Sequence, residues 1–155
     1  MKVGIVGLGK MGSAMAARFS ERGFSVVGWD ANPAHLSRLS SAARSPAELV
    51  AVSDCVISII SDGPGVRNLY LGERGFLSRP VEGKLFIEMS TVTPAIAREL
   101  EPIVTSQGAA FIESPVMGSV PKARVRLAQA GGHRRGHLMA PHHEGRAHDL
   151  CNLCG

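Results

Sequence analysis

Three glycines near the N-terminus have the spacing that is needed to hold a phosphate group. Gly7, Gly9 and Gly12 follow the apolar run Lys2 to Val6 and give the pattern G-x-G-x-x-G. In this pattern the first glycine permits a tight turn, the second lets the backbone approach a pyrophosphate, and the third lets a helix pack closely. The helix then points its first amides and the positive end of its dipole at the phosphates. By itself the pattern also fits a plain strand-turn-helix unit.

An acidic residue lies where a second contact with a nucleotide is expected. Asp30 follows the strand-like run Ser25 to Trp29. A carboxylate at the tip of the second strand accepts hydrogen bonds from the adenosine ribose hydroxyls and repels a 2′-phosphate. We therefore expect NAD as the cofactor, with NADP possible. The alternative is that Asp30 only precedes a short helix that Asn32 caps and Pro33 begins.

Strand-like and helix-like segments alternate along most of the chain. We expect strands over 2–6, 25–29, 54–60, 84–88 and 109–113, and helices over 13–22, 33–39, 45–52, 66–71 and 94–107. Near-continuous apolar strands are typical of parallel sheets covered on both faces. Alternation with helices indicates right-handed crossovers. The predicted fold is an α/β, Rossmann-type, doubly wound parallel sheet.

Several single residues are predicted to have structural roles within these elements. Met15 and Phe19 lie one turn apart and should face the core. Cys55 sits in an apolar run with no cation evident beside it, so we expect a core residue and not a reactive thiol. Thr93 should cap the helix that follows it, and Pro102 should bend that helix.

Two segments follow predicted strands at the edge where a ligand is expected. Open α/β sheets bind their ligands beyond the carboxyl ends of the strands. Ile60 and the segment Ser61 to Gly65 follow the third strand, and Ser90 and Thr91 follow the fourth. These residues are candidates for contacts with the cofactor or the substrate.

Composition excludes several other classes of protein. With 155 residues, 45% hydrophobic and 19% charged, the chain is long enough for one domain with a core. The formal charge of +4 is not concentrated on the body, since residues 1–124 carry 13 basic and 11 acidic side chains. No apolar run approaches the roughly 18 residues of a membrane span, and a strand begins directly after Met1, where a signal peptide would lie. We expect a cytoplasmic protein with no nucleic-acid or membrane partner.

Three motifs occur in order over roughly residues 1–124. They are Gly7-Leu8-Gly9-Lys10-Met11-Gly12-Ser13-Ala14-Met15-Ala16, Glu88-Met89-Ser90-Thr91-Val92-Thr93-Pro94 and Glu113-Ser114-Pro115-Val116-Met117-Gly118-Ser119. Together they resemble the β-hydroxyacid dehydrogenase family, which includes 3-hydroxyisobutyrate dehydrogenase and, more distantly, 6-phosphogluconate dehydrogenase. The family patterns are G-x-G-x-M-G-x-x-M-A, D-x-S-T-x-x-P and D-A-P-V-S-G-G. The departures from these patterns include Glu88, Met117 and Ser119, and the identity of the substrate stays open.

The resemblance implies an NAD(P)-dependent oxidoreductase that transfers a hydride between the nicotinamide and a small 3-hydroxy acid or semialdehyde. It places Thr91 at the cofactor and Ser90 near the substrate. The expected cofactor contacts are Gly7, Leu8, Gly9, Lys10, Met11, Gly12, Asp30, Ile60, Ser61, Gly65 and Thr91. The expected substrate contacts are Ser90, Met117, Gly118 and Ser119.

The resemblance also implies parts that are not found in this sequence. Family members carry a catalytic lysine, which acts as general acid/base, on a long helix, followed by an all-α C-terminal domain that forms the dimer. The last lysine here is Lys122, which does not match that position. We therefore expect a truncated chain that lacks the all-α domain and in which residues 1–124 form the dinucleotide-binding domain. No catalytic residue is identified in it. The homo-oligomer that the family forms is not expected to carry over to this chain. The alternative function is a catalytically inactive dinucleotide-binding fragment.

The remaining residues, 125–155, have a different composition, with five of the six histidines and two of the three cysteines. One interpretation is a zinc site, with ligands drawn from His142, His143, His148, Cys151 and Cys154. The other is sequence foreign to the family, as after a change of reading frame, forming an irregular, basic, disordered tail. We favour the tail and predict no metal, because structural zinc sites often use two spaced ligand pairs and only one is present. A third option is a basic tail that binds a partner.

Overall fold

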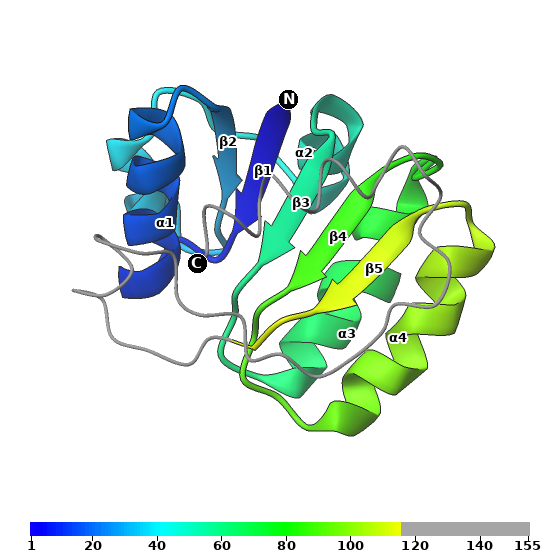
Figure 1. The fold of residues 1–155 in the computed structure, drawn as a ribbon. Helices are drawn as coiled ribbons and strands as arrows, with labels where there is room; N and C mark the ends of the chain where they lie inside the picture. Colours follow the sequence, from blue (N-terminus) through cyan, green and yellow to red (C-terminus); the bar gives the residue numbers. More distant parts are fainter. Residues whose placement is uncertain (116–155) are drawn as a thin grey trace.

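A five-stranded sheet with helices on both faces makes up residues 1–115, the part of the chain that the computed structural model describes (Figure 1). The strands are β1 Lys2–Val6, β2 Ser25–Trp29, β3 Cys55–Ser58, β4 Leu85–Glu88 and β5 Ala110–Glu113. Neighbouring strands all pair in parallel, in the order β2-β1-β3-β4-β5. The predicted Rossmann-type doubly wound sheet is confirmed.

The strand order reverses direction at β1. From β1 the chain moves outward to β2, and then it returns to place β3 on the other side of β1. Val6, the last residue of β1, is in register with Trp29 of β2 and Ser58 of β3. The loops after β1 and β3 therefore leave toward opposite faces, and this opens a crevice at the carboxyl edge where doubly wound sheets bind ligands.

Helices cover the two faces of the sheet and define two hydrophobic clusters. The helices are α1 Lys10–Glu21, η1 Pro33–Arg38, α2 Pro46–Val52, α3 Gly63–Leu71, η2 Phe76–Ser78 and α4 Pro94–Ser106, where η marks a 3-10 helix. Side chains of α1 pack with one face of β1, β2 and β3, whereas α2, α3 and α4 pack on the opposite face. Both faces of the central strands are thus buried, which accounts for their near-continuous apolar sequence.

Most of the predicted local roles are confirmed. Met15 and Phe19 of α1 are buried in the core, and so is Cys55 of β3. Asn32 and Ser45 cap η1 and α2, and each side chain accepts a backbone amide at 3.1 Å. These local signals were strong because a short polar side chain followed by proline favours the first turn of a helix.

Some element ends differ from the prediction. The first helix, α1, begins at Lys10 and not at residue 13, because Gly9 is its N-cap. The third, α3, begins at Gly63 and not at residue 66, because the Asp62 carboxylate accepts the amide of Gly65 at 2.7 Å. The third strand, β3, ends at residue 58 and not at 60.

The predicted capping bond of Thr93 is wrong. Thr93 does occupy the N-cap position of α4, but its hydroxyl makes no capping hydrogen bond. A capping hydroxyl would accept a hydrogen bond from the amide of Ile96. That amide instead donates to the carbonyl oxygen of Thr93 at 3.0 Å. Pro102 lies inside α4, and the helix continues past it to residue 106.

Several predictions lie outside the described residues. They concern the substrate contacts Met117, Gly118 and Ser119, the position of Lys122, and the structure of residues 125–155. Within residues 1–115, no helix combines the length and the apolar character that crossing a membrane requires.

Candidate functional site

The glycine turn between β1 and α1 is sterically closed at two positions and open at the third. Gly7 has a φ of +88°, and a Cβ there would lie 2.0 Å from the carbonyl oxygen of Ile59. A Cβ on Gly12 would lie 1.8 Å from the carbonyl oxygen of Gly7. At Gly9, in contrast, no atom lies within 4 Å of the Cβ position. The turn therefore needs glycine at 7 and 12 for its own packing, whereas Gly9 borders open space that a ligand can occupy.

The N-terminus of α1 begins at this open space. The first amides of a helix have no acceptor within the helix. Gly9 has no side chain to cap them, and the first turn of α1 contains no acidic residue. The partial positive charge of the helix end is therefore not neutralised locally, and Lys10 adds a full positive charge. This arrangement suits an anion such as a phosphate.

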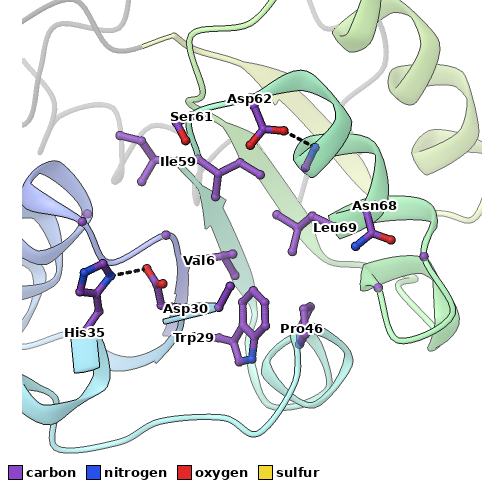
Figure 2. A pocket seen from close by; sticks show the side chains of 18 of the residues that line it. Val6, Trp29, Asp30, His35, Pro46, Ile59, Ser61, Asp62, Asn68 and Leu69 are labelled. Carbon is purple, nitrogen blue, oxygen red and sulfur yellow. Dashed lines mark hydrogen bonds and ion pairs between the residues drawn. The ribbon is translucent and has the colours of Figure 1, made fainter. Parts of the chain in front are cut away.

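Asp30 links the tip of β2 to the glycine turn. Its Oδ2 atom accepts the amide of Leu8 at 2.6 Å, and its Oδ1 atom accepts the amide of Asn32 at 2.8 Å. The Nδ1 atom of His35 lies 3.1 Å from Oδ2, as Figure 2 shows. Burial by itself would raise the pKa of Asp30, but the hydrogen bonds from Asn32, His35 and Leu8 outweigh it and hold the pKa below its ordinary value. Asp30 is thus a carboxylate at neutral pH.

A cavity of about 840 Å³ lies across the carboxyl ends of β1, β2 and β3 (Figure 2). Ligand pockets typically measure about 300–1,000 Å³. The predicted cofactor residues that line it are Gly7, Gly9, Lys10, Met11, Gly12, Asp30, Ile60, Ser61 and Gly65. Leu8 is buried and is not a lining residue, but its amide binds Asp30. Thr91 is exposed and does not line this cavity.

Further lining residues were not predicted from the sequence. They are Val6, Trp29, Ala31, His35, Pro46, Ile59, Asn68, Leu69, Gly72, Glu73, Arg74 and Gly75, whereas Asp62, which also lines the cavity, belongs to the predicted segment Ser61 to Gly65. The side chains of Trp29 and Leu69 form an apolar part of the cavity wall, and Figure 2 shows both at the cavity. A signal for Trp29 was available, since it directly precedes Asp30 at the end of a strand. No comparable signal exists for Arg74, which reaches the cavity only because the loop after α3 folds back.

Ser90 is close to the cavity wall but is itself buried. Its Oγ atom accepts the amide of Ile60 at 2.9 Å, and its own amide donates to Oε1 of Glu88 at 2.8 Å. Only 3% of the Ser90 surface is exposed. The structure thus joins Ser90 to the loop after β3, and its contact with a substrate stays a prediction.

Among residues 1–115, no cluster of three or more His, Cys, Asp or Glu side chains is arranged to hold a metal ion.

Comparisons with known proteins agree with this geometry. Residues 2–135 match the family described as the NAD-binding domain of 6-phosphogluconate dehydrogenase. The mitochondrial 3-hydroxyisobutyrate dehydrogenase of Mus musculus is 33% identical over 126 residues, which are 79% of this chain and 38% of that protein. The cytokine-like nuclear factor N-PAC of Danio rerio is 36% identical over 122 residues, which are 76% of this chain and 26% of that protein.

Solved structures of similar proteins have the same fold. The 3-hydroxyisobutyrate dehydrogenase of Mycobacterium tuberculosis, determined with L-serine, superposes with a TM-score of 0.80 at 28% identity. That comparison covers 99% of this chain and 52% of the other chain. The present chain spans 26% and 38% of the length of the two curated relatives named above.

Proposed function

This chain belongs to the family of NAD-binding domains of 6-phosphogluconate dehydrogenase, and from this premise we propose that it is the cofactor domain of an oxidoreductase that resembles 3-hydroxyisobutyrate dehydrogenase. The family description names NAD as the cofactor. The proposed reaction is reversible hydride transfer between the nicotinamide ring and a small 3-hydroxy acid or its semialdehyde. In such enzymes the cofactor supplies the redox chemistry, and the protein supplies binding and orientation.

The proposal rests on the finding that Gly9, the start of α1 and the Asp30 carboxylate all border one cavity, with open space at the Cβ position of Gly9. The amides of the first turn of α1 would hold the pyrophosphate. Asp30 would accept hydrogen bonds from the adenosine ribose hydroxyls. Because β2 and β1 then lie under the adenosine and the phosphates, the nicotinamide half would extend toward β3 and β4.

We expect NAD to bind more tightly than NADP because Asp30 is ionised and would repel a 2′-phosphate. In calorimetric titrations, Asp30→Ala should weaken NAD binding by about tenfold or more, since hydrogen bonds to a charged group are lost. Asp30→Asn is the matched control, because its side-chain oxygen can still accept the amide of Leu8. Tighter binding of NADP than of NAD by the wild type would show that Asp30 does not have this role.

A second candidate is a domain that binds the dinucleotide without catalysing the reaction. The positions of the lysines in residues 1–115 favour it. Lys2 and Lys84 lie at the amino ends of β1 and β4, at the edge of the sheet opposite Ser90, and the Nζ atom of Lys84 donates to the carbonyl of Ser53 at 2.8 Å. Lys10 lies at the phosphate cradle. None of these three positions suits a general acid/base near Ser90, which must reach the reacting oxygen.

Turnover distinguishes the two candidates. The chain is mixed with NAD and 3-hydroxyisobutyrate, and the absorbance of the reduced nicotinamide is followed. We expect NAD binding without turnover from the 155-residue chain. Formation of NADH at a rate proportional to protein concentration would instead identify the chain as an active enzyme.

A further inference from the structure

Four polar residues are linked by hydrogen bonds beneath the carboxyl ends of β3 and β4. They are Ser58, Tyr70, Glu88 and Ser90, and each of them is buried. The Oγ atom of Ser58 donates to Oε2 of Glu88 at 2.5 Å and lies 3.2 Å from the hydroxyl of Tyr70. The surroundings are apolar, since the ring of Tyr70 packs against Phe76 and other aromatic rings. Glu88 is therefore a carboxyl group in a hydrophobic core, with 1% of its surface exposed.

A chain of hydrogen bonds runs from this buried group to the wall of the cavity. The second carboxyl oxygen of Glu88, Oε1, accepts the amide of Ser90 at 2.8 Å. The hydroxyl oxygen of Ser90 accepts the amide of Ile60 at 2.9 Å. Ile60 belongs to the loop between β3 and α3 and lines the cavity, whereas Glu88 and Ser90 do not. The loop that forms part of the cavity wall is thus connected by hydrogen bonds, through Ser90, to the buried Glu88.

A buried carboxyl at this position is costly for stability. Removing such a group from water is unfavourable unless hydrogen bonds compensate, and an apolar residue of similar size often packs at lower free energy. Glu88 has partners on a strand, in a loop and on a helix, since Ser58 ends β3, Ser90 lies in the loop after β4 and Tyr70 lies in α3. These partners lie on the elements that border the β3 loop. The arrangement therefore fits a role in fixing that loop.

We propose that Glu88 is a positioning residue for the nicotinamide half of the cofactor site, acting through Ser90 on the backbone of Ile60. The inference rests on the proposed NAD-binding function. Without the acceptor at position 88, the amide of Ser90 loses its partner and the Ser90 hydroxyl no longer holds the Ile60 amide in place. The adenosine and phosphate contacts at Asp30 and Gly9 are on other elements and should be unaffected.

The test compares NAD with ADP, which carries only the adenosine and phosphate half. Both are titrated by calorimetry into the full chain and into Glu88→Leu, Glu88→Gln and Ser90→Ala. Glu88→Leu and Ser90→Ala should weaken NAD binding by about tenfold while ADP binding changes by less than about twofold. Glu88→Gln should bind NAD nearly as well as the wild type, because its amide oxygen still accepts the Ser90 amide.

Ser53→Ala is the matched control. Ser53 is a buried serine with 2% exposure, and its hydroxyl donates to the carbonyl of Leu49 at 2.7 Å. It lies before β3, at the opposite edge of the sheet, so its removal should leave both affinities unchanged. General loss of folding lowers NAD and ADP binding together, and this result in Ser90→Ala would overturn the positioning role. Unchanged NAD binding in both Glu88→Leu and Ser90→Ala would also overturn it. If the wild type bound neither nucleotide, the proposed function itself would fail.

Discussion

Asp30 borders the cavity, whereas Glu88 is buried in the core next to its wall, and the surroundings of these two carboxyl groups shift their pKa values in opposite directions. Asp30 is partly exposed and accepts two backbone amides, so its pKa lies below the ordinary value. For Glu88, burial raises the pKa, and the hydrogen bonds from Ser58, Ser90 and Tyr70 offset only part of this effect. Asp30 is suited to meet a polar ligand as an anion, whereas Glu88 is suited to an internal role.

The raised pKa of Glu88 predicts how stability depends on pH. The folded state holds this proton more tightly than the unfolded state, in which the pKa is near 4.5. The contribution of the protonated Glu88 to the free energy of unfolding is therefore fully present below that pH, and it is lost as the pH rises through the pKa of the folded state. Glu88→Gln carries no titratable group here. We expect its free energy of unfolding, relative to the wild type, to increase from about pH 4 toward neutral pH in urea denaturation. A difference that is independent of pH would contradict this.

Single residues could be predicted where a local sequence pattern defines their role, and not where their role depends on how distant segments fold together. Gly7, Gly9 and Gly12 were predictable because the pattern that sets their steric requirement lies within six consecutive residues. Asp30 was predictable because it directly follows a strand, although its hydrogen bond from the Leu8 amide was not predicted. His35 was not predicted, because its approach to Asp30 depends on how η1 folds back.

At the scale of elements, the contact between α1 and the end of β1 is the tightest feature of the site. Gly12 lets α1 approach so closely that a Cβ would lie 1.8 Å from the carbonyl oxygen of Gly7. That oxygen belongs to the backbone and cannot swing away as a side chain would. The geometry of the first turn of α1, and with it the phosphate cradle, therefore depends on this contact.

Gly12→Ala should accordingly be destabilising. Forcing α1 away from the strand is an overpacking change, which typically costs about 1–3 kcal/mol, and this backbone clash should reach or exceed the upper value. Urea denaturation measures the loss of stability. Gly9→Ala is the control, because its Cβ meets no atom within 4 Å and its φ of −62° is ordinary for alanine. Equal stability of Gly12→Ala and the wild type would show that the helix can shift without cost.

The existence of the elements was easier to predict than their ends. Hydrophobic runs located all five strands, because both faces of the sheet are covered. The start of α1 was missed because its N-cap is Gly9, which gives no side-chain signal. The start of α3 was missed because Gly63-Pro64-Gly65 has the composition of a loop, and the first turn is recognised from the hydrogen bonds that Gly65 and Val66 donate to Asp62. End positions therefore depend on contacts that periodicity does not encode.

At the scale of the whole molecule, residues 1–115 form a parallel α/β sheet, and the chain belongs to the family of NAD-binding domains of 6-phosphogluconate dehydrogenase. The division at residue 124, the zinc alternative for the tail and the cytoplasmic location stay predictions. The names of the relatives include both a mitochondrial enzyme and a nuclear factor, so they do not indicate one compartment. The substrate loop around Met117 also stays a prediction, because it lies outside the described residues.

The most direct test of the account is calorimetric titration of the purified 155-residue chain with NAD, in parallel with Gly9→Ala. The wild type should bind NAD with a dissociation constant below millimolar. Gly9→Ala should remain folded, since its Cβ enters open space, but it should bind NAD more weakly by about tenfold or more because that space is where the pyrophosphate must approach. If the wild type shows no binding below millimolar, or if Gly9→Ala binds NAD as tightly as the wild type, the cavity at the glycine turn is not the cofactor site.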